Sequence, residues 1–251
     1  MITPNMEERL DSVISRLRYW RGVLREFLPV EYTERVEDKQ KLPIDCKDWQ
    51  SFNPPYTVYQ TEKYYWFKAK FTIKRASAYQ KAYLCLDTHI TGVSSTIRPQ
   101  GLLYLNGEVV QGIDINHGDV MLEDGEYEMY LLFYTHTFER YLPLDFSIQY
   151  VDERVNGLYY DLYVPFQSLK LLDKKSNDYI DSVSVLEKAL NLLDVRNVHS
   201  ESFYQSVEET RSYLAKEYYG GVCGSKQTVR LIGHTHIDVA WLWDLDQTQQ
   251  K

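Results

Sequence analysis

Three side chains near the end of the sequence combine metal-ligand chemistry with regular spacing. His234, His236 and Asp238 occupy alternate positions directly after the short apolar segment Val229–Gly233. In an extended chain every second side chain points to the same side, so all three would project from one face. Imidazole nitrogens and carboxylate oxygens are ligands that Zn²⁺ accepts readily, and a mixed set can leave a coordination position open for substrate. The pattern predicts a metal site at the end of a strand, where α/β proteins place active sites.

A purely structural interpretation of the same residues stays open. Two histidines can be satisfied by neighbouring polar groups, and Asp238 can be the N-cap of the helix that follows it. The apolar strand before the motif and the apolar residues after it favour the metal site. Two further histidines, His89 and His117, lie near carboxylates in predicted loops. We interpret both as surface residues rather than ligands.

The elements that must position this motif change character along the chain. From about Tyr56 apolar and polar residues alternate, and turn residues separate the segments, which is typical of strands. Asn106-Gly107 is a strong hairpin signal, because a type I′ turn requires positive φ at both central residues. Many short strands without intervening helices favour an antiparallel sandwich or jelly roll. The predicted strands are Tyr64–Ile73, Ala82–Asp87, Leu102–Leu105, Glu108–Val110, Tyr127–Tyr134, Phe146–Val151 and Leu158–Val164.

The aromatic run Tyr64–Phe67 has two interpretations. It could form a platform on which a sugar stacks, or it could belong to the core of a sandwich. Strict alternation places Tyr64 and Trp66 on one face of the strand and Tyr65 and Phe67 on the other. This arrangement suits a sandwich strand, so we predict core packing.

Helical periodicity occurs at both ends of the chain. The N-terminal segment carries apolar residues at spacings of three and four, with Asn5 and Glu8 as a capping box and Pro29 beyond its end. After Pro165 the pattern predicts two helices, around Tyr179–Leu193 and Phe203–Leu214. The N-terminal stripe consists of Met6, Leu10, Val13, Ile14, Leu17, Trp20, Val23, Leu24 and Phe27. It is typical of a face that docks on the same protein or on a second subunit, so a homo-oligomer stays possible.

These patterns predict a mainly β protein with helices. Residues 1–30 form an amphipathic helix, residues 31–170 an antiparallel, jelly-roll-like β-sandwich, and residues 171–228 a helical connector. Residues 229–251 begin an α/β-barrel catalytic domain with its first strand. That barrel cannot close within the residues that remain.

Composition limits the classes of function. The 251 residues carry 28 Lys and Arg against 36 Asp and Glu, a formal net charge of −8 that disfavours nucleic-acid binding. The three cysteines, Cys46, Cys85 and Cys223, form no CxxC pair and so predict neither a disulfide framework nor a cysteine zinc site. We find no signal-peptide pattern and no apolar run long enough to cross a bilayer. The sequence predicts a cytoplasmic protein that does not bind membranes.

The string GHTHIDVAWLW, from Gly233 to Trp243, resembles the opening motif of the catalytic domain in glycoside hydrolase family 38, the retaining, zinc-dependent α-mannosidases. Its Ile-Asp-Val-Ala-Trp-Leu-Trp form is most similar to the cytosolic and bacterial branch. The segment GLLYLNGEVVQGIDINHGDV, from Gly101 to Val120, is similar to the N-terminal β-sandwich of the same family. The resemblance implies hydrolysis of α-mannosidic bonds in mannose-containing oligosaccharides.

The resemblance also implies roles for single residues. His236 and Asp238 would ligate Zn²⁺, and His234 would support the site from beside it. Trp241 matches the aromatic residue that stacks on the mannose ring. An indole face against the apolar side of a sugar removes apolar surface from water, which agrees with that role.

The catalytic nucleophile is expected downstream of this motif. Retaining glycosidases need two carboxyl groups. The carboxylate residues that follow Asp238 in this sequence are Asp244 and Asp246, and neither stands in the sequence context of the family's nucleophile. We therefore expect the 251 residues alone to be inactive. Two alternatives remain: another metal-dependent hydrolase, since amidohydrolase-type barrels also carry an HxH motif, and a non-catalytic carbohydrate-binding module. The Asp after the second His, the following WLW and the preceding sandwich favour the mannosidase.

Overall fold

The computed structural model describes residues 4–52, 57–58, 61–88, 99–135, 142–222 and 230–233. The described residues divide into two compact units. A β unit comprises residues 24–150, and a helical unit comprises the N-terminal residues to Val23 together with the chain from Val151. The structure is thus a mixture of antiparallel sheets and helices, as the sequence predicts, and no barrel is closed in the described residues.

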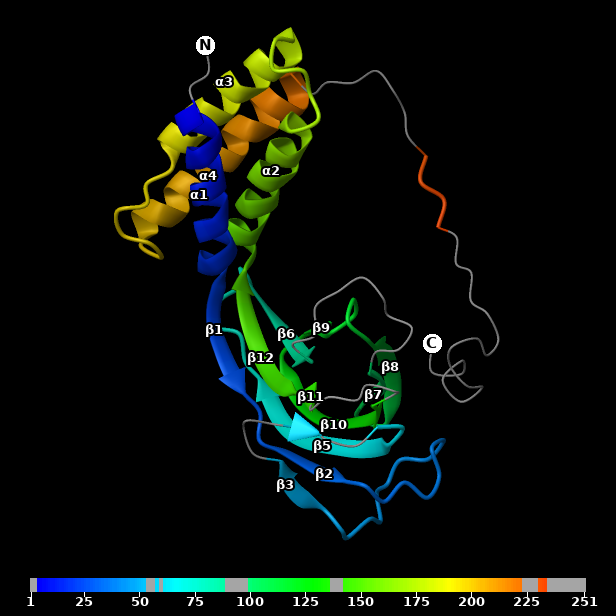
Figure 1. Ribbon diagram of the computed structural model, residues 1–251. Coiled ribbons are helices and arrows are strands. Elements are labelled where there is room, and N and C mark those ends of the chain that lie inside the picture. The colour runs from blue at the N-terminus through cyan, green and yellow to red at the C-terminus, as the bar shows by residue number, and fades with distance from the viewer. Residues whose placement is uncertain are drawn as a thin grey trace. The chain divides into compact units, whose positions relative to one another are not determined.

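In the described residues, two large sheets and one short strand pair build the β unit (Figure 1). The smaller has the order β1-β12-β6-β9 and the larger the order β3-β2-β5-β10-β7-β8. The short strands β11 and β4 pair with each other as a separate two-stranded sheet. The strands are β1 Gly22–Phe27, β2 Val30–Thr33, β3 Gln50–Phe52, β4 Thr57–Val58, β5 Tyr64–Ile73, β6 Gln80–Asp87, β7 Gln100–Leu105, β8 Glu108–Ile113, β9 Asp119–Leu122, β10 Gly125–Tyr134, β11 Leu142–Pro143 and β12 Asp145–Asp152. Six of the seven predicted strands are therefore confirmed, as β5, β6, β7, β8, β10 and β12.

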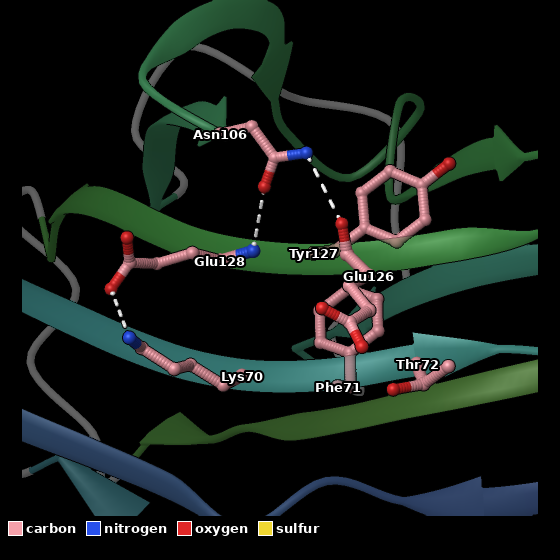
Figure 2. Close-up of a pocket in the computed structure, with 7 residues that line it drawn as sticks. All are labelled: Lys70, Phe71, Thr72, Asn106, Glu126, Tyr127 and Glu128. Carbon is pink, nitrogen blue, oxygen red and sulfur yellow. Dashed lines mark hydrogen bonds and ion pairs between the residues drawn. The ribbon is translucent and has the colours of Figure 1, made fainter.

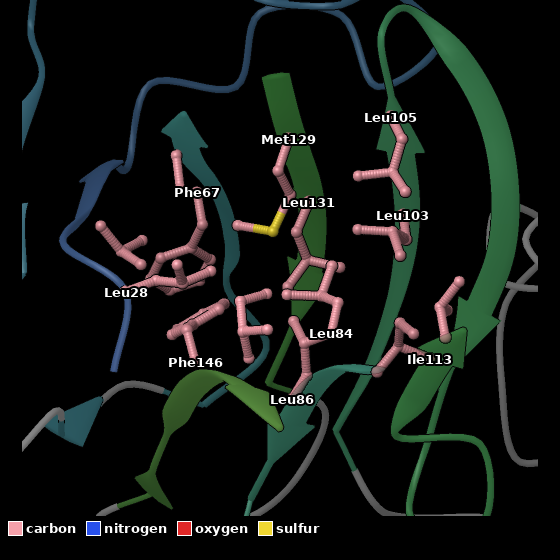
Figure 3. Close-up of a cluster of buried hydrophobic side chains, with 14 of the residues drawn as sticks. Leu28, Phe67, Leu84, Leu86, Leu103, Leu105, Ile113, Met129, Leu131 and Phe146 are labelled. Carbon is pink, nitrogen blue, oxygen red and sulfur yellow. The ribbon is translucent and has the colours of Figure 1, made fainter. Parts of the chain in front are cut away.

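The main hydrophobic core lies between the two large sheets (Figure 3). Phe67 from β5 and Met129 and Leu131 from β10 meet Leu84 from β6 and Phe146 from β12. Phe67 is fully buried, and its ring centroid lies 5.2 Å from that of Phe146 in the opposite sheet. Face-to-face packing of this kind confirms the predicted sandwich.

Alternation in β5 supplies a second, smaller core on the outer face of the larger sheet. Tyr65 and Phe67 point into the main core, whereas Trp66 packs with Tyr130 and Leu132 on the other side. Trp66 is 1% exposed, because partly buried side chains, Val36, Leu42, Trp49, Tyr64 and Tyr104, pack against this cluster. The prediction that the aromatic run is core rather than a sugar platform is confirmed.

The β7–β8 hairpin turns at Asn106-Gly107, as predicted. The φ angles are 50° at Asn106 and 87° at Gly107, so both central residues occupy the left-handed region. Asn and Gly tolerate that region with little steric cost, which explains the choice of residues. The two strands pair antiparallel on either side of the turn.

The N-terminal helix is shorter than its apolar stripe suggests. Helix α1 spans Pro4–Trp20, and Met6, Leu10, Ile14 and Leu17 form its buried face. The expected cap is wrong: the helix begins at Pro4, a residue suited to the first helical position, so Asn5 lies inside the first turn. The continuation to Phe27 is also wrong, because Gly22 is a poor helix former and begins β1.

The described part of the helical unit contains three further α-helices, α2 Glu153–Leu169, α3 Asn177–Leu192 and α4 Glu201–Leu214, followed by a π-helix, η1, at Ala215–Val222. The two predicted helices are confirmed as α3 and α4. The predicted strand Leu158–Val164 is wrong, because it lies in the middle of α2. The four α-helices share one apolar core, in which Leu10, Leu158, Leu186, Phe203 and Leu214 are fully buried. No helix in the described residues is long and apolar enough to cross a membrane.

Pro165 lies inside α2 rather than before a helix. Proline has no backbone N–H, so it cannot donate to the carbonyl oxygen of Asp161 one turn earlier. The Tyr219 hydroxyl, from η1, donates to that carbonyl oxygen at 3.2 Å. The carboxylate of Asp161 accepts from Arg211 Nε of α4 at 2.8 Å. The neighbouring elements η1 and α4 thus provide hydrogen-bond donors to Asp161 at the point where Pro165 cannot donate the helical hydrogen bond.

Candidate functional site

The predicted metal site lies outside the residues that the structure describes. Among the residues outside the described part are His234, His236, Asp238 and Trp241, together with His89, Asp244 and Asp246. Their assignments stay predictions. Of the strand predicted before the motif, residues 230–233 are described, and they are not in a strand. Leu231 and Ile232 are 92% and 88% exposed.

Elsewhere the described histidines have structural partners. His117 Nδ1 lies 2.9 Å from Asp114 Oδ1, and the same carboxylate accepts from the backbone N–H groups of Asn116 and His117. His117 therefore belongs to a turn at the surface. His199 Nδ1 lies 3.1 Å from the Tyr204 hydroxyl. In the described part of the chain no three His, Cys, Asp or Glu side chains come together as a possible metal site.

A cavity of about 470 Å³ lies where β5, β10 and the β7–β8 turn meet (Figure 2). Its volume falls in the range of small-molecule sites, roughly 300–1,000 Å³. Seven residues line it: Lys70, Thr72, Glu126 and Glu128 from the outer face of the larger sheet, Phe71 and Tyr127, whose rings pack toward the main core, and Asn106 from the turn. Among the sequence-based predictions only Asn106 was singled out, and only as a turn residue.

The strand register brings the cavity residues together. In the antiparallel pairing of β5 with β10, Thr72 stands opposite Glu126, Phe71 opposite Tyr127, and Lys70 opposite Glu128. The Phe71 and Tyr127 rings stack, with centroids 5.6 Å apart and planes at 19°. Both rings are partly buried and pack against the main core. Their positions are therefore fixed by the fold.

Asn106 is held against β10 by three hydrogen bonds. Its backbone N–H donates to Glu128 O at 2.9 Å, its Nδ2 donates to Glu126 O at 3.2 Å, and its Oδ1 accepts from Glu128 N at 2.8 Å. A primary amide has two donor hydrogens and two acceptor lone pairs, so one of each remains for a ligand. The turn thus presents an oriented amide to the cavity.

The charged side chains of the cavity divide into a pair and a single carboxylate. Lys70 Nζ lies 3.0 Å from Glu128 Oε1, and this hydrogen bond raises the pKa of Lys70 above its usual value. No described residue forms a hydrogen bond or ion pair with the Glu126 carboxylate. Figure 2 shows the Lys70–Glu128 pair to the left of Glu126 and Thr72.

A second, larger hollow of about 910 Å³ lies beside β2 and β5. Its lining is mainly apolar and includes Phe27, Ile44 and Phe52. The polar groups at its edge include the ion pair of Lys68 with Glu31, at 3.0 Å. This hollow shares Lys70 and Glu128 with the cavity at Asn106.

Comparison with known proteins gives two similar sequences, and no family model matches the chain. Alpha-mannosidase G of Dictyostelium discoideum is 24% identical over 90% of this chain. Alpha-mannosidase 2C1 of Homo sapiens is 23% identical over 92% of it. The chain spans 22% of the length of each of these relatives. The similarity is distant, but it covers both units and supports a relationship to α-mannosidases.

Proposed function

We propose that this chain is the N-terminal part of a zinc-dependent, retaining α-mannosidase of the glycoside hydrolase family 38 type, in its cytosolic and bacterial branch. The proposed substrate is a mannose-containing oligosaccharide. The observation that carries the proposal is the similarity to two proteins named alpha-mannosidases over 90% and 92% of the chain. The motif from Gly233 to Trp243 supports it as well, because its histidines and aspartate are side chains that Zn²⁺ accepts as ligands.

The donor set fits Zn²⁺. His236 and Asp238 would hold the ion through an imidazole nitrogen and a carboxylate oxygen, with His234 supporting them. Bound zinc would act as a Lewis acid that holds sugar hydroxyl groups and stabilises developing charge. Trp241 would orient the mannose ring by covering its apolar face.

The proposal assigns hydrolysis to the longer protein rather than to these 251 residues. A retaining mechanism requires a nucleophile and a general acid/base, both carboxyl groups. Asp244 and Asp246 do not stand in the sequence context of the family's nucleophile. We therefore expect the 251-residue chain to show no α-mannosidase activity.

The decisive experiment uses the protein encoded by the complete reading frame. We expect His236→Ala to lose both bound zinc, measured by elemental analysis, and hydrolysis of p-nitrophenyl α-mannoside. The matched control is His117→Ala, which removes an imidazole that is 66% exposed and paired with Asp114. The control should retain zinc and activity. Full zinc content and activity in His236→Ala would refute the ligand assignment, whereas a wild-type protein without α-mannosidase activity would refute the function.

A further inference from the structure

We propose that the outer face of α2 is a docking surface for a second copy of this chain, and that two α2 helices pack antiparallel in a two-fold symmetric dimer. This face carries four exposed apolar side chains, Tyr160, Tyr163, Val164 and Leu171, which we call the α2 stripe. Their exposed fractions are 48%, 37%, 52% and 88%. The dimer does not depend on the proposed function.

Helix α2 has apolar residues on two opposite sides. One side, with Leu158 and Leu162, is buried in the core of the helical unit. Spacings of four and seven residues place Tyr160, Val164 and Leu171 together on the opposite side, because a helix repeats every 3.6 residues. A helix that is apolar on both sides is typically covered on both. The α2 stripe therefore has the character of a surface that a partner covers.

The N-terminal stripe, which the sequence suggests as a docking face, already has its partner within the same chain. Met6, Leu10, Ile14 and Leu17 are buried in the core of the helical unit. Helix α1 thus offers little apolar surface to a second subunit. The α2 stripe, in contrast, keeps its apolar side chains exposed.

Neighbouring groups hold the aromatic side chains of the α2 stripe in place. The Tyr163 ring stacks on Tyr159, with centroids 5.3 Å apart and planes at 15°. The Arg21 guanidinium lies 5.9 Å from the centroid of the Tyr160 ring, and its Nη1 donates to Asn156 Oδ1 at 3.0 Å. Side chains that are ordered in the free chain lose little freedom when a partner covers them. Tyrosine and arginine are also enriched at the energetic centres of protein interfaces.

The charges around the α2 stripe favour a second copy as the partner. Beside the middle of the stripe, Asp161 is paired with Arg211 at 2.8 Å, so this part is neutral. Glu153 lies in the first turn of α2, and Lys170 is the C-cap, so the two ends carry opposite charges. In an antiparallel pair the acidic end of each helix lies beside the basic end of the other, and the helix dipoles are opposed as well. The α2 stripe is thus complementary to itself.

A membrane surface matches the α2 stripe less well. Helices that lie on membranes carry basic residues along the flanks of their apolar face. The residues of α2 that flank the stripe are Asn156, Asp161, Gln167 and Ser168, and none of these four is basic. The net charge of −8 also opposes binding to anionic lipid. The same charge opposes contact between copies, which favours an interface at a neutral face such as this one.

The test is the mass of the 251-residue chain in solution, measured by sedimentation equilibrium over a range of concentrations. We expect a monomer–dimer equilibrium in the wild type. Val164→Glu should weaken dimerisation by about 100-fold or more, because each dimer would bury two unpaired carboxylates. The matched control is Val109→Glu, which introduces the same charge at a valine of β8 that is 59% exposed. This control should dimerise like the wild type.

An exchange of charges tests the antiparallel arrangement. Glu153→Lys should weaken the dimer, and Lys170→Glu in the same chain should restore it. Failure of the second substitution to restore the dimer would overturn the antiparallel arrangement.

Two results would overturn the docking surface itself. One is a wild type that stays monomeric at every concentration, and the other is equal dimerisation of Val164→Glu and wild type. Neither result bears on the zinc content or the α-mannosidase activity of His236→Ala, so the dimer and the proposed function can fail separately.

Discussion

Asp152 is the last residue of β12 and the N-cap of α2, so one side chain serves two elements. Its Oδ1 accepts from Arg154 N at 3.0 Å, which caps the helix. Its carboxylate also binds the Arg154 guanidinium, with Nη2 2.6 Å from Oδ2 and Nε 3.1 Å from Oδ1. The Asp152 side chain is 3% exposed and that of Arg154 is 18% exposed. We predict that Asp152→Ala strongly destabilises the helical unit.

The magnitude follows from two separable losses. Removing an N-cap costs about 1 kcal/mol. Removing one partner of a buried ion pair costs roughly 3–5 kcal/mol, and the partial exposure of Arg154 moves the value toward the lower end. The total expected for Asp152→Ala is therefore about 4 kcal/mol. Asp152→Asn retains the cap and shape but exchanges charge-assisted hydrogen bonds for neutral ones, so we expect about 1–2 kcal/mol.

The assay is urea unfolding followed by far-UV circular dichroism, whose helical signal reports mainly on the helical unit. Ser176→Ala is the matched control, because Ser176 caps α3 through a bond to Tyr179 N at 3.2 Å without an ion pair. Ser176→Ala should lower the free energy of unfolding by about 1 kcal/mol and leave the slope of that free energy against urea concentration unchanged. If Asp152→Ala costs no more than Ser176→Ala, the ion pair contributes nothing and the reasoning fails.

Two further predictions concern the β unit. A Cβ at Gly101 would lie 2.8 Å from Leu131 Cδ1 and 3.1 Å from Leu132 O, so Gly101→Ala should lower stability by about 1–3 kcal/mol in urea unfolding. The control Gly125→Ala, with its nearest neighbour at 3.7 Å, should be neutral or stabilising; equal effects would contradict the argument. Burial raises the pKa of Cys85 to about 11 from 9.0, which disfavours the thiolate. At pH 8 its alkylation should be about 100-fold slower in the native than in the unfolded chain, measured by peptide mass mapping, and equal rates would refute the burial argument.

The strand β5, which packs against apolar residues on both of its faces, was predictable from the sequence. In β5, Tyr65 and Phe67 face the main core, and Trp66 between them faces the smaller core. Each face of the strand is therefore apolar at every second residue, which is the period of a strand. Asn106-Gly107 was equally informative, because few residue pairs tolerate positive φ at both positions. These features are local, and local steric preferences suffice to predict them.

The error at Leu158–Val164 has a specific cause. Nearly every residue of LYYDLYV is apolar or aromatic, so periods of 2 and 3.6 fit equally well over so short a window. The helical stripe becomes clear only over the whole of α2, where Val155, Leu158, Leu162 and Phe166 are buried. Asp152 followed by Glu153 was an available N-cap signal. Pro165 argued against a helix, but Tyr219, from an element 50 residues later along the chain, satisfies the freed carbonyl.

The cavity at Asn106 could not be predicted from the sequence because it depends on pairing between distant strands. Glu126 and Glu128 are two of many surface glutamates until β10 pairs with β5 and sets them beside Thr72 and Lys70. A slip of one residue would send these side chains to the opposite face and separate the Phe71–Tyr127 stack. The residues of the metal motif, in contrast, lie within five positions of one another, so the sequence suggests the motif without any knowledge of strand register. Sites made by residues close together in the sequence are accessible to sequence reasoning, and sites made by strand register require the fold.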